Sequence, residues 1–123
     1  MRFVQAALVL ASCLLLFSIC AIGQNSMGVA DRYWISFSEQ VKVADKLLPS
    51  GSYEVRHVME GPDHIMVFRQ MGVKNPIAVH AKCVLVALSA KAEQSQKIFE
   101  LNAANERVLK ELTFKGDTAK HVF

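Results

Sequence analysis

Apolar residues recur at every second position along most of this chain, beginning just after Asp31. Tyr33, Ile35 and Phe37 alternate with polar or exposed-type neighbours, and the same spacing returns in several later segments. Successive side chains of a β-strand point to opposite faces of its sheet, so a period of two predicts strands with one buried face. We therefore expect an all-β fold, a small antiparallel sandwich or barrel of about six to eight strands.

Turn residues divide the alternating segments from one another. Ala44-Asp45 and Pro49-Ser50-Gly51 each suit a tight reversal, and Gly61-Pro62 suits the tip of a hairpin between the strand segments 53–58 and 64–70. That tip predicts a register in which Glu60 pairs with Asp63, Val55 with Phe68 and His57 with Met66. The valine-rich run 77–88 predicts a long central strand.

Residues 89–112 fit two interpretations. Several good helix formers lie near the start, and Ile98, Leu101 and Val108 can share one face of a helix. Strand spacing is also present on both sides of the turn candidate 102–105. We favour a hairpin here, because the preceding strands need partners to cover their edges.

The N-terminus predicts where the protein goes. One positive charge, an apolar run over 3–22 and a small residue, Gly23, form the pattern of an export signal helix. We expect residues 1–23 to be a signal peptide, 24–31 a linker and 32–123 a single β-rich domain.

Two alternatives to cleavage after Gly23 remain open. The apolar run reaches the roughly 20 residues that span a bilayer, so an uncleaved segment would anchor the domain in a membrane. Leu10-Ala11-Ser12-Cys13 resembles the lipobox of bacterial lipoproteins, in which the cysteine is lipidated. Lipidation at Cys13 would leave the apolar stretch 14–22 on the mature chain, which argues against this alternative.

The expected signal peptide also determines which cysteines the mature chain keeps. Cys13 and Cys20 lie within it, so the cleaved chain keeps only Cys83 and forms no internal disulfide. Cys83 stands in the apolar run 79–86, where a buried thiol that packs as a small hydrophobic side chain is expected. The mature domain, about 100 residues long, must then be held by a packed core alone.

Charge gives no indication of a strongly charged partner. Without Arg2 the chain keeps 13 basic residues against 11 acidic ones, and the basic residues are scattered singly. Nucleic-acid binding is therefore not expected, since it needs clustered basic residues interleaved with aromatic ones.

One segment carries a resemblance. Trp34 to Phe37, Val41 to Val43, and Leu48-Pro49-Ser50-Gly51-Ser52-Tyr53-Glu54-Val55 resemble small secreted bacterial proteins of unassigned function with a Leu-Pro-x-Gly-x-Tyr-x-Val segment. The segment Leu112 to Gly116 is similar to the last strand of those proteins. The resemblance implies an all-β domain and carries over no catalytic residue.

Histidines, serines and carboxylates predict no site. His57, His64 and His80 fall on successive strands, but their register separates them and no pair has the short spacing of metal ligands. We interpret them as three unrelated histidines on edges or surfaces. Ser50 and Ser52 belong to a turn rather than to a nucleophile elbow. Glu60 and Asp63 bracket another turn, and no glycine-rich phosphate loop occurs.

We accordingly predict no catalytic, cofactor-binding or metal-binding residues and no cofactor. The expected function is that of an exported, non-catalytic binding or structural domain of the bacterial cell envelope, periplasmic or extracellular. Its partner would be a protein or a small apolar ligand, with membrane contact only if the N-terminal segment is retained. The alternative is a small β-barrel whose interior holds an apolar ligand, lined by Met59, Met66, Phe68 and Phe99.

Overall fold

The computed structural model describes residues 28–123. All the regular secondary structure in this part of the chain is β-strand. The strands are β1 (Arg32–Phe37), β2 (Val41–Val43), β3 (Lys46–Leu48), β4 (Gly51–Glu60), β5 (Asp63–Gln70), β6 (Ala78–Ala87), β7 (Gln96–Leu101), β8 (Arg107–Thr113) and β9 (Ala119–Val122). The predicted all-β class is confirmed. The predicted leader, with Cys13 and Cys20, lies outside the described residues. Within 28–123 no helix is long and apolar enough to cross a membrane.

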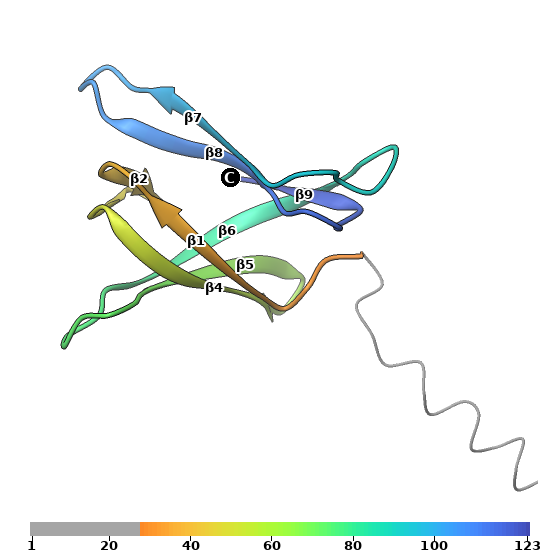
Figure 1. The fold of residues 1–123 in the computed structure, drawn as a ribbon, viewed down its shortest axis with the longest axis horizontal. Coiled ribbons are helices and arrows are strands. Elements are labelled where there is room, and N and C mark those ends of the chain that lie inside the picture. Colours follow the sequence, from red (N-terminus) through yellow and green to blue (C-terminus); the bar gives the residue numbers. More distant parts are fainter. Residues whose placement is uncertain (1–27) are drawn as a thin grey trace, which may run out of the picture.

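The nine strands form one open sheet in the order β1-β4-β5-β6-β9-β8-β2-β3, and β7 pairs with β8 outside this path. Neighbouring strands run antiparallel except β2 and β8, which meet in parallel at Lys42 and Val108. β6 joins the two halves, because Ala78 to Cys83 pair with β5 while Val84 to Ala87 pair with β9. The sheet folds over at this strand, so that β7 and β8 lie across from β4 and β5 (Figure 1).

The hairpin of β4 and β5 has the predicted register. Glu60 pairs with Asp63, Val55 with Phe68 and His57 with Met66. Gly61 at the tip has a φ of +61°, which glycine adopts at little cost, and Pro62 supplies the fixed negative φ that follows it. A two-residue tip leaves no freedom of register, which is why the sequence alone predicted this pairing.

Two further turns decide the neighbouring hairpins. Ala44 and Asp45, at φ values of 49° and 63°, close the two-residue loop between β2 and β3. Between β7 and β8, Asn102 Oδ1 accepts hydrogen bonds from the backbone N–H groups of Ala104 and Glu106, at 3.1 and 2.9 Å. The hairpin predicted within 89–112 is therefore confirmed, and the competing helix is not formed.

The core lies between the two halves of the folded sheet. Tyr33, Ile35 and Phe37 are buried, as their spacing predicted, and the Tyr33 ring stacks on that of Phe114 with centroids 3.7 Å apart. The largest fully buried side chains are Tyr53, Phe68, Leu48, Met66, Leu112, His121, Val41, Val43 and Val55. This interior is filled by the protein's own side chains.

Residues 28–31, which the sequence assigned to the linker, lie against the domain. Val29 is buried, and the carbonyl of Gly28 accepts a hydrogen bond from the N–H of Thr118 at 3.1 Å. The carbonyl of Asp31 accepts another from the N–H of His57 at 2.9 Å. The folded unit thus begins at least four residues before β1.

Candidate functional site

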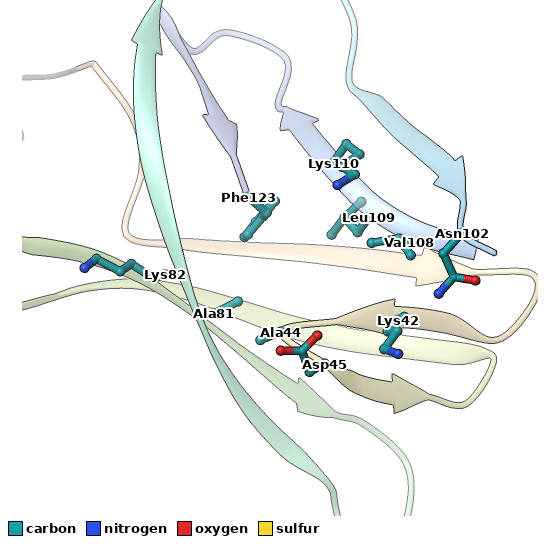
Figure 2. A pocket seen from close by; sticks show the side chains of 10 residues that line it. All are labelled: Lys42, Ala44, Asp45, Ala81, Lys82, Asn102, Val108, Leu109, Lys110 and Phe123. Carbon is teal, nitrogen blue, oxygen red and sulfur yellow. The ribbon is translucent and has the colours of Figure 1, made fainter. Parts of the chain in front are cut away.

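A cleft of about 460 Å³ opens between β6 on one side and β2 and β8 on the other (Figure 2). Ala81 and Leu109, 1% and 2% exposed, form part of its floor. The side chain of Phe123 lies in the gap between β6 and β8 in Figure 2, and the centroid of its ring is 5.9 Å from that of the Phe68 ring. The cleft therefore reaches down to the side chains of the core.

Charged side chains line the rim of this cleft. Lys42, Lys110 and Asp45 contribute to its wall, together with the amide of Asn102, whereas the side chain of Lys82 points away from the cleft in Figure 2. Each lysine has an acidic neighbour: Glu106 at 3.2 Å from Lys42, Asp63 at 3.3 Å from Lys82 and Glu100 at 3.8 Å from Lys110. The pair of Lys110 and Glu100 is exposed and contributes little to stability, so Lys110 can turn to a bound acidic group at small cost.

The wall formed by β6 is a free strand edge. The N–H of Gln70 bonds to the carbonyl of Ile77, which shows that the odd-numbered residues of β6 face β5. The backbone groups of Ala78, His80 and Lys82 consequently point away from β5. β9 pairs with β6 only from Val84 onward, so no described strand lies against this edge.

A second polar feature lies inside the domain, where three histidines gather. His57 Nε2 and His64 Nδ1 are 3.0 Å apart, and their rings are nearly parallel with centroids 5.1 Å apart. His121, on β9, has its ring centroid 5.6 Å from that of His57, and its Nδ1 is 3.9 Å from the sulfur of Cys83. The interpretation of His57 and His64 as unrelated is wrong, because inward-facing diagonal positions of β4 and β5 meet.

His121 was not among the predicted site residues. The alternation of a strand places His121 on the same face as Ala119. The sequence does not show, however, which strands lie beside β9. The side chain is fully buried, and its Nε2 has no hydrogen-bond partner within the described residues. Burial and the neighbouring His57 and His64 lower its pKa to about 4, so its imidazole is neutral at physiological pH.

This cluster does not activate the Cys83 thiol. Burial raises the pKa of Cys83 to about 11, whereas that of the adjacent His121 is about 4. The proton therefore stays on sulfur at neutral pH, and no thiolate forms to act as a nucleophile. The prediction that Cys83 is buried as a packing residue is confirmed.

Tyr33 and Asp117 form a buried polar contact near the same end of the core. The Tyr33 hydroxyl donates to Asp117 Oδ2 at 2.5 Å and accepts from the N–H of Ala30 at 2.7 Å. Burial, followed by the bond to Asp117, raises the pKa of Tyr33 well above its usual range. Desolvation likewise raises the pKa of Asp117, although the bonds from Tyr33 and Ala30 oppose this. The contact ties residues 28–31 to the segment that precedes β9.

The other residues singled out in the sequence are dispersed. His80 is on the outer face of β6, 3.5 Å from Glu60, while Asp63 contacts Lys82. Ser52 Oγ lies 3.1 Å from that of Ser36 on the exposed face, and neither it nor Ser50 has a histidine partner. Within 28–123 no group of three or more histidine, cysteine or acidic side chains is arranged to hold a metal ion.

The four residues expected to line a barrel interior do not share a cavity. Met66 and Phe68 are fully buried in the packed core, Met59 is 53% exposed, and Phe99 packs at the margin of the core. None of them lines the cleft between β2, β6 and β8.

The described residues define a class of fold: an open, folded all-β sheet with a filled core. No family model, curated protein or solved structure matches the chain.

Proposed function

We propose that this protein is an exported, non-catalytic binding domain of the bacterial cell envelope, released by cleavage after Gly23 and folded as a small sandwich. The observation that carries the proposal is the free edge of β6 beside the cleft between β2, β6 and β8. The proposed partner is an extended segment of another protein, which would add a strand to this edge.

Two features of the cleft support an extended protein segment. Backbone groups of Ala78, His80 and Lys82 point away from β5 and can form a ladder of hydrogen bonds with an incoming strand. The floor offers apolar contact through Leu109 and Phe123, while the lysines of the rim suit acidic side chains of the incoming segment. Backbone pairing supplies affinity in such complexes, and side-chain contacts supply specificity.

Site-specific photocrosslinking in the exported protein tests this proposal. A benzophenone amino acid at position 82, on the free edge, should crosslink to one defined envelope protein, through a short segment of that partner. The same probe at position 115, on an exposed turn elsewhere, is the matched control and should give no adduct.

The variant His80→Pro sharpens this experiment. Proline at position 80 removes a backbone N–H that points away from β5, so the hydrogen bonds between β5 and β6 are kept. The free edge of β6 loses one hydrogen-bond donor, and the proline ring hinders the approach of another strand. Crosslinking at position 82 should then fall at least about tenfold, as expected when a central backbone bond and the strand approach are lost. Persistence of the adduct in a folded His80→Pro domain would refute strand addition.

The alternative, a carrier of a small apolar ligand, has one observation in its favour, the apolar floor of the same cleft. Native mass spectrometry of the protein purified from its host separates the two. A bound small molecule and no crosslink would favour the carrier. N-terminal sequencing with intact mass decides among a start at Gln24, a lipidated Cys13 and an uncut, membrane-anchored Met1.

A further inference from the structure

Trp34 is the only tryptophan of the chain, and its side chain is 63% exposed on the outer face of β1. Tryptophan is highly buried on average, so such exposure is unusual for a residue of this size. No aromatic ring of the described residues stacks on it. Its cross-strand neighbour is Glu54, whose carboxylate is held by Arg32 and Arg56, so the indole stands in polar surroundings.

Trp34 is one of the residues that line a cleft of about 190 Å³ between the edges of β1 and β7. Buried Leu112 and Phe114 form its apolar floor, and the polar side chains around it are Ser36, Ser95, Gln96, Lys97 and Thr113. This cleft is distinct from the one beside β6, with which it shares no lining residue.

Lys97 fixes the width of this cleft. Its Nζ donates to the carbonyl of Ser36 at 2.6 Å, which joins the edges of two strands that are not paired with each other. The same ammonium lies 5.9 Å from the centroid of the Phe37 ring. The cleft is thus held open before any ligand arrives, which lowers the entropic cost of binding.

We propose that Trp34 and this cleft bind one sugar ring of an oligosaccharide built from neutral pyranoses. The C–H groups on the face of such a ring carry partial positive charge and complement the negative face of the indole. The amide of Gln96 and the hydroxyls of Ser95 and Thr113 can bond the ring hydroxyls. The volume is below the roughly 300 Å³ of sites that enclose a whole small molecule, which suits one ring of a longer chain.

The local charges disfavour the other common ligand of an exposed indole, a quaternary ammonium. Lys97 lies within the cleft, and an ammonium beside another cation is repelled. A neutral polyhydroxylated ligand is not repelled in this way.

The chain offers an unusually direct test, because all tryptophan fluorescence comes from Trp34. Purified protein should show saturable quenching and a spectral shift when titrated with chitohexaose, a soluble chain of β-1,4-linked N-acetylglucosamine. Tetramethylammonium is the comparison probe and should leave the spectrum unchanged. A response to tetramethylammonium but not to chitohexaose or cellohexaose would overturn the proposal.

Calorimetry on variants then locates the site. Trp34→Ala should weaken chitohexaose binding at least about tenfold, Trp34→Phe less, and Gln96→Ala to an intermediate extent. Val84→Ala is the matched control, since Val84 is also 63% exposed but lies on β6, and it should bind as the parent does. Unchanged binding by a folded Trp34→Ala variant would place the sugar elsewhere.

This inference goes beyond the proposed function, on which it rests only for export to a compartment where envelope glycans occur. The two proposals fail separately. If no crosslink forms at position 82, the fluorescence titration can still support sugar binding at Trp34. If no sugar binds, the proposal of strand addition at the β6 edge is not affected.

Discussion

Asp117 and His121 are the buried polar side chains of the described core, 7% and 0% exposed, and they differ in how they are satisfied. Asp117 accepts a hydrogen bond from Tyr33, whereas Nε2 of His121 has no partner in the described structure. Leaving a buried donor or acceptor unpaired costs free energy, and charging such a group costs more. Both residues therefore determine how the stability of the domain depends on its environment.

We predict that the domain loses stability as the pH falls from about 6.5 to about 4. The pKa of His121 is about 4 in the folded protein, below its ordinary value of 6.5, so the unfolded chain takes up a proton that the folded one refuses. The contribution of neutral His121 to the free energy of unfolding is complete above pH 6.5. It is lost as the pH falls from 6.5 to 4, and the total loss is about 3 kcal/mol. Because the pKa of His57 is also lowered, His57 likewise reduces stability as the pH falls. The raised pKa of Asp117 has the opposite effect on stability.

Urea unfolding between pH 7 and pH 4 measures this effect. His121→Leu should flatten the dependence on pH, and it should retain most of the stability at pH 7, because Nε2 has no partner to lose and Nδ1 loses only a contact of 3.9 Å with the sulfur of Cys83. His80→Gln, on the outer face, is the matched histidine control and should keep the slope of the parent. Equal slopes for the parent and the His121→Leu variant would show that another group governs acid unfolding.

Removal of the Tyr33 hydroxyl should also destabilise the domain. In Tyr33→Phe the carboxylate of Asp117 and the N–H of Ala30 lose their partner, at a cost of about 1–3 kcal/mol in the free energy of unfolding. Tyr53→Phe is the matched control, because its hydroxyl bonds only one group, the carbonyl of Pro49 at 2.6 Å. The two losses should be distinguishable in urea at pH 7, and a larger loss for Tyr53→Phe would contradict this account.

At the scale of the strand, β6 has two different edges along its length. Its second half pairs with β9, whereas its first half pairs with β5 and leaves its other edge facing the cleft. A free edge exposes unpaired backbone groups and is a template for another strand. The polar side chain of His80 and the charged side chain of Lys82 keep this edge polar in the free domain.

Amide hydrogen exchange should therefore alternate along the first half of β6. The N–H groups of Val79 and Ala81 bond to β5 and should exchange slowly, whereas those of His80 and Lys82 should exchange rapidly. NMR of the free domain measures each rate. Protection of His80 and Lys82 as strong as that of Val79 would mean that another segment already covers the edge.

At the scale of the whole molecule, a core without any disulfide in the described residues must carry the stability. Cys83 is 5% exposed in this core, and burial raises its pKa to about 11. Thiol reagents need both access and a thiolate, so the native protein meets neither condition.

The domain lacking its leader should react with a disulfide-exchange reagent at pH 8 only as fast as it unfolds or opens. The reaction of Cys83 should be slower by several orders of magnitude than in urea, because the open state of a stable domain is rare. Addition of a reducing agent should leave the unfolding midpoint unchanged. Rapid labelling of the native protein would show that β6 opens locally near Cys83.

Local patterns account for much of this fold. The register of β4 and β5 followed from the two-residue tip at Gly61 and Pro62, and the buried face of β1 followed from its alternation. The hairpin of β7 and β8 was harder to predict, because the same residues also fit a helix until the Asn102 turn is seen. The first two predictions required no knowledge of distant segments, whereas the hairpin was favoured because the preceding strands need partners to cover their edges.

The sequence by itself thus determined the strands, their inward faces and the burial of Cys83, since these depend on side-chain period and on turns of a few residues. Tertiary structure alone placed His121 beside His57, left the edge of β6 open and set Trp34 at a cleft next to β7. These features depend on the order of strands in the sheet and on its fold at β6. Such pairings join segments far apart in the chain, and no local pattern of residues specifies them.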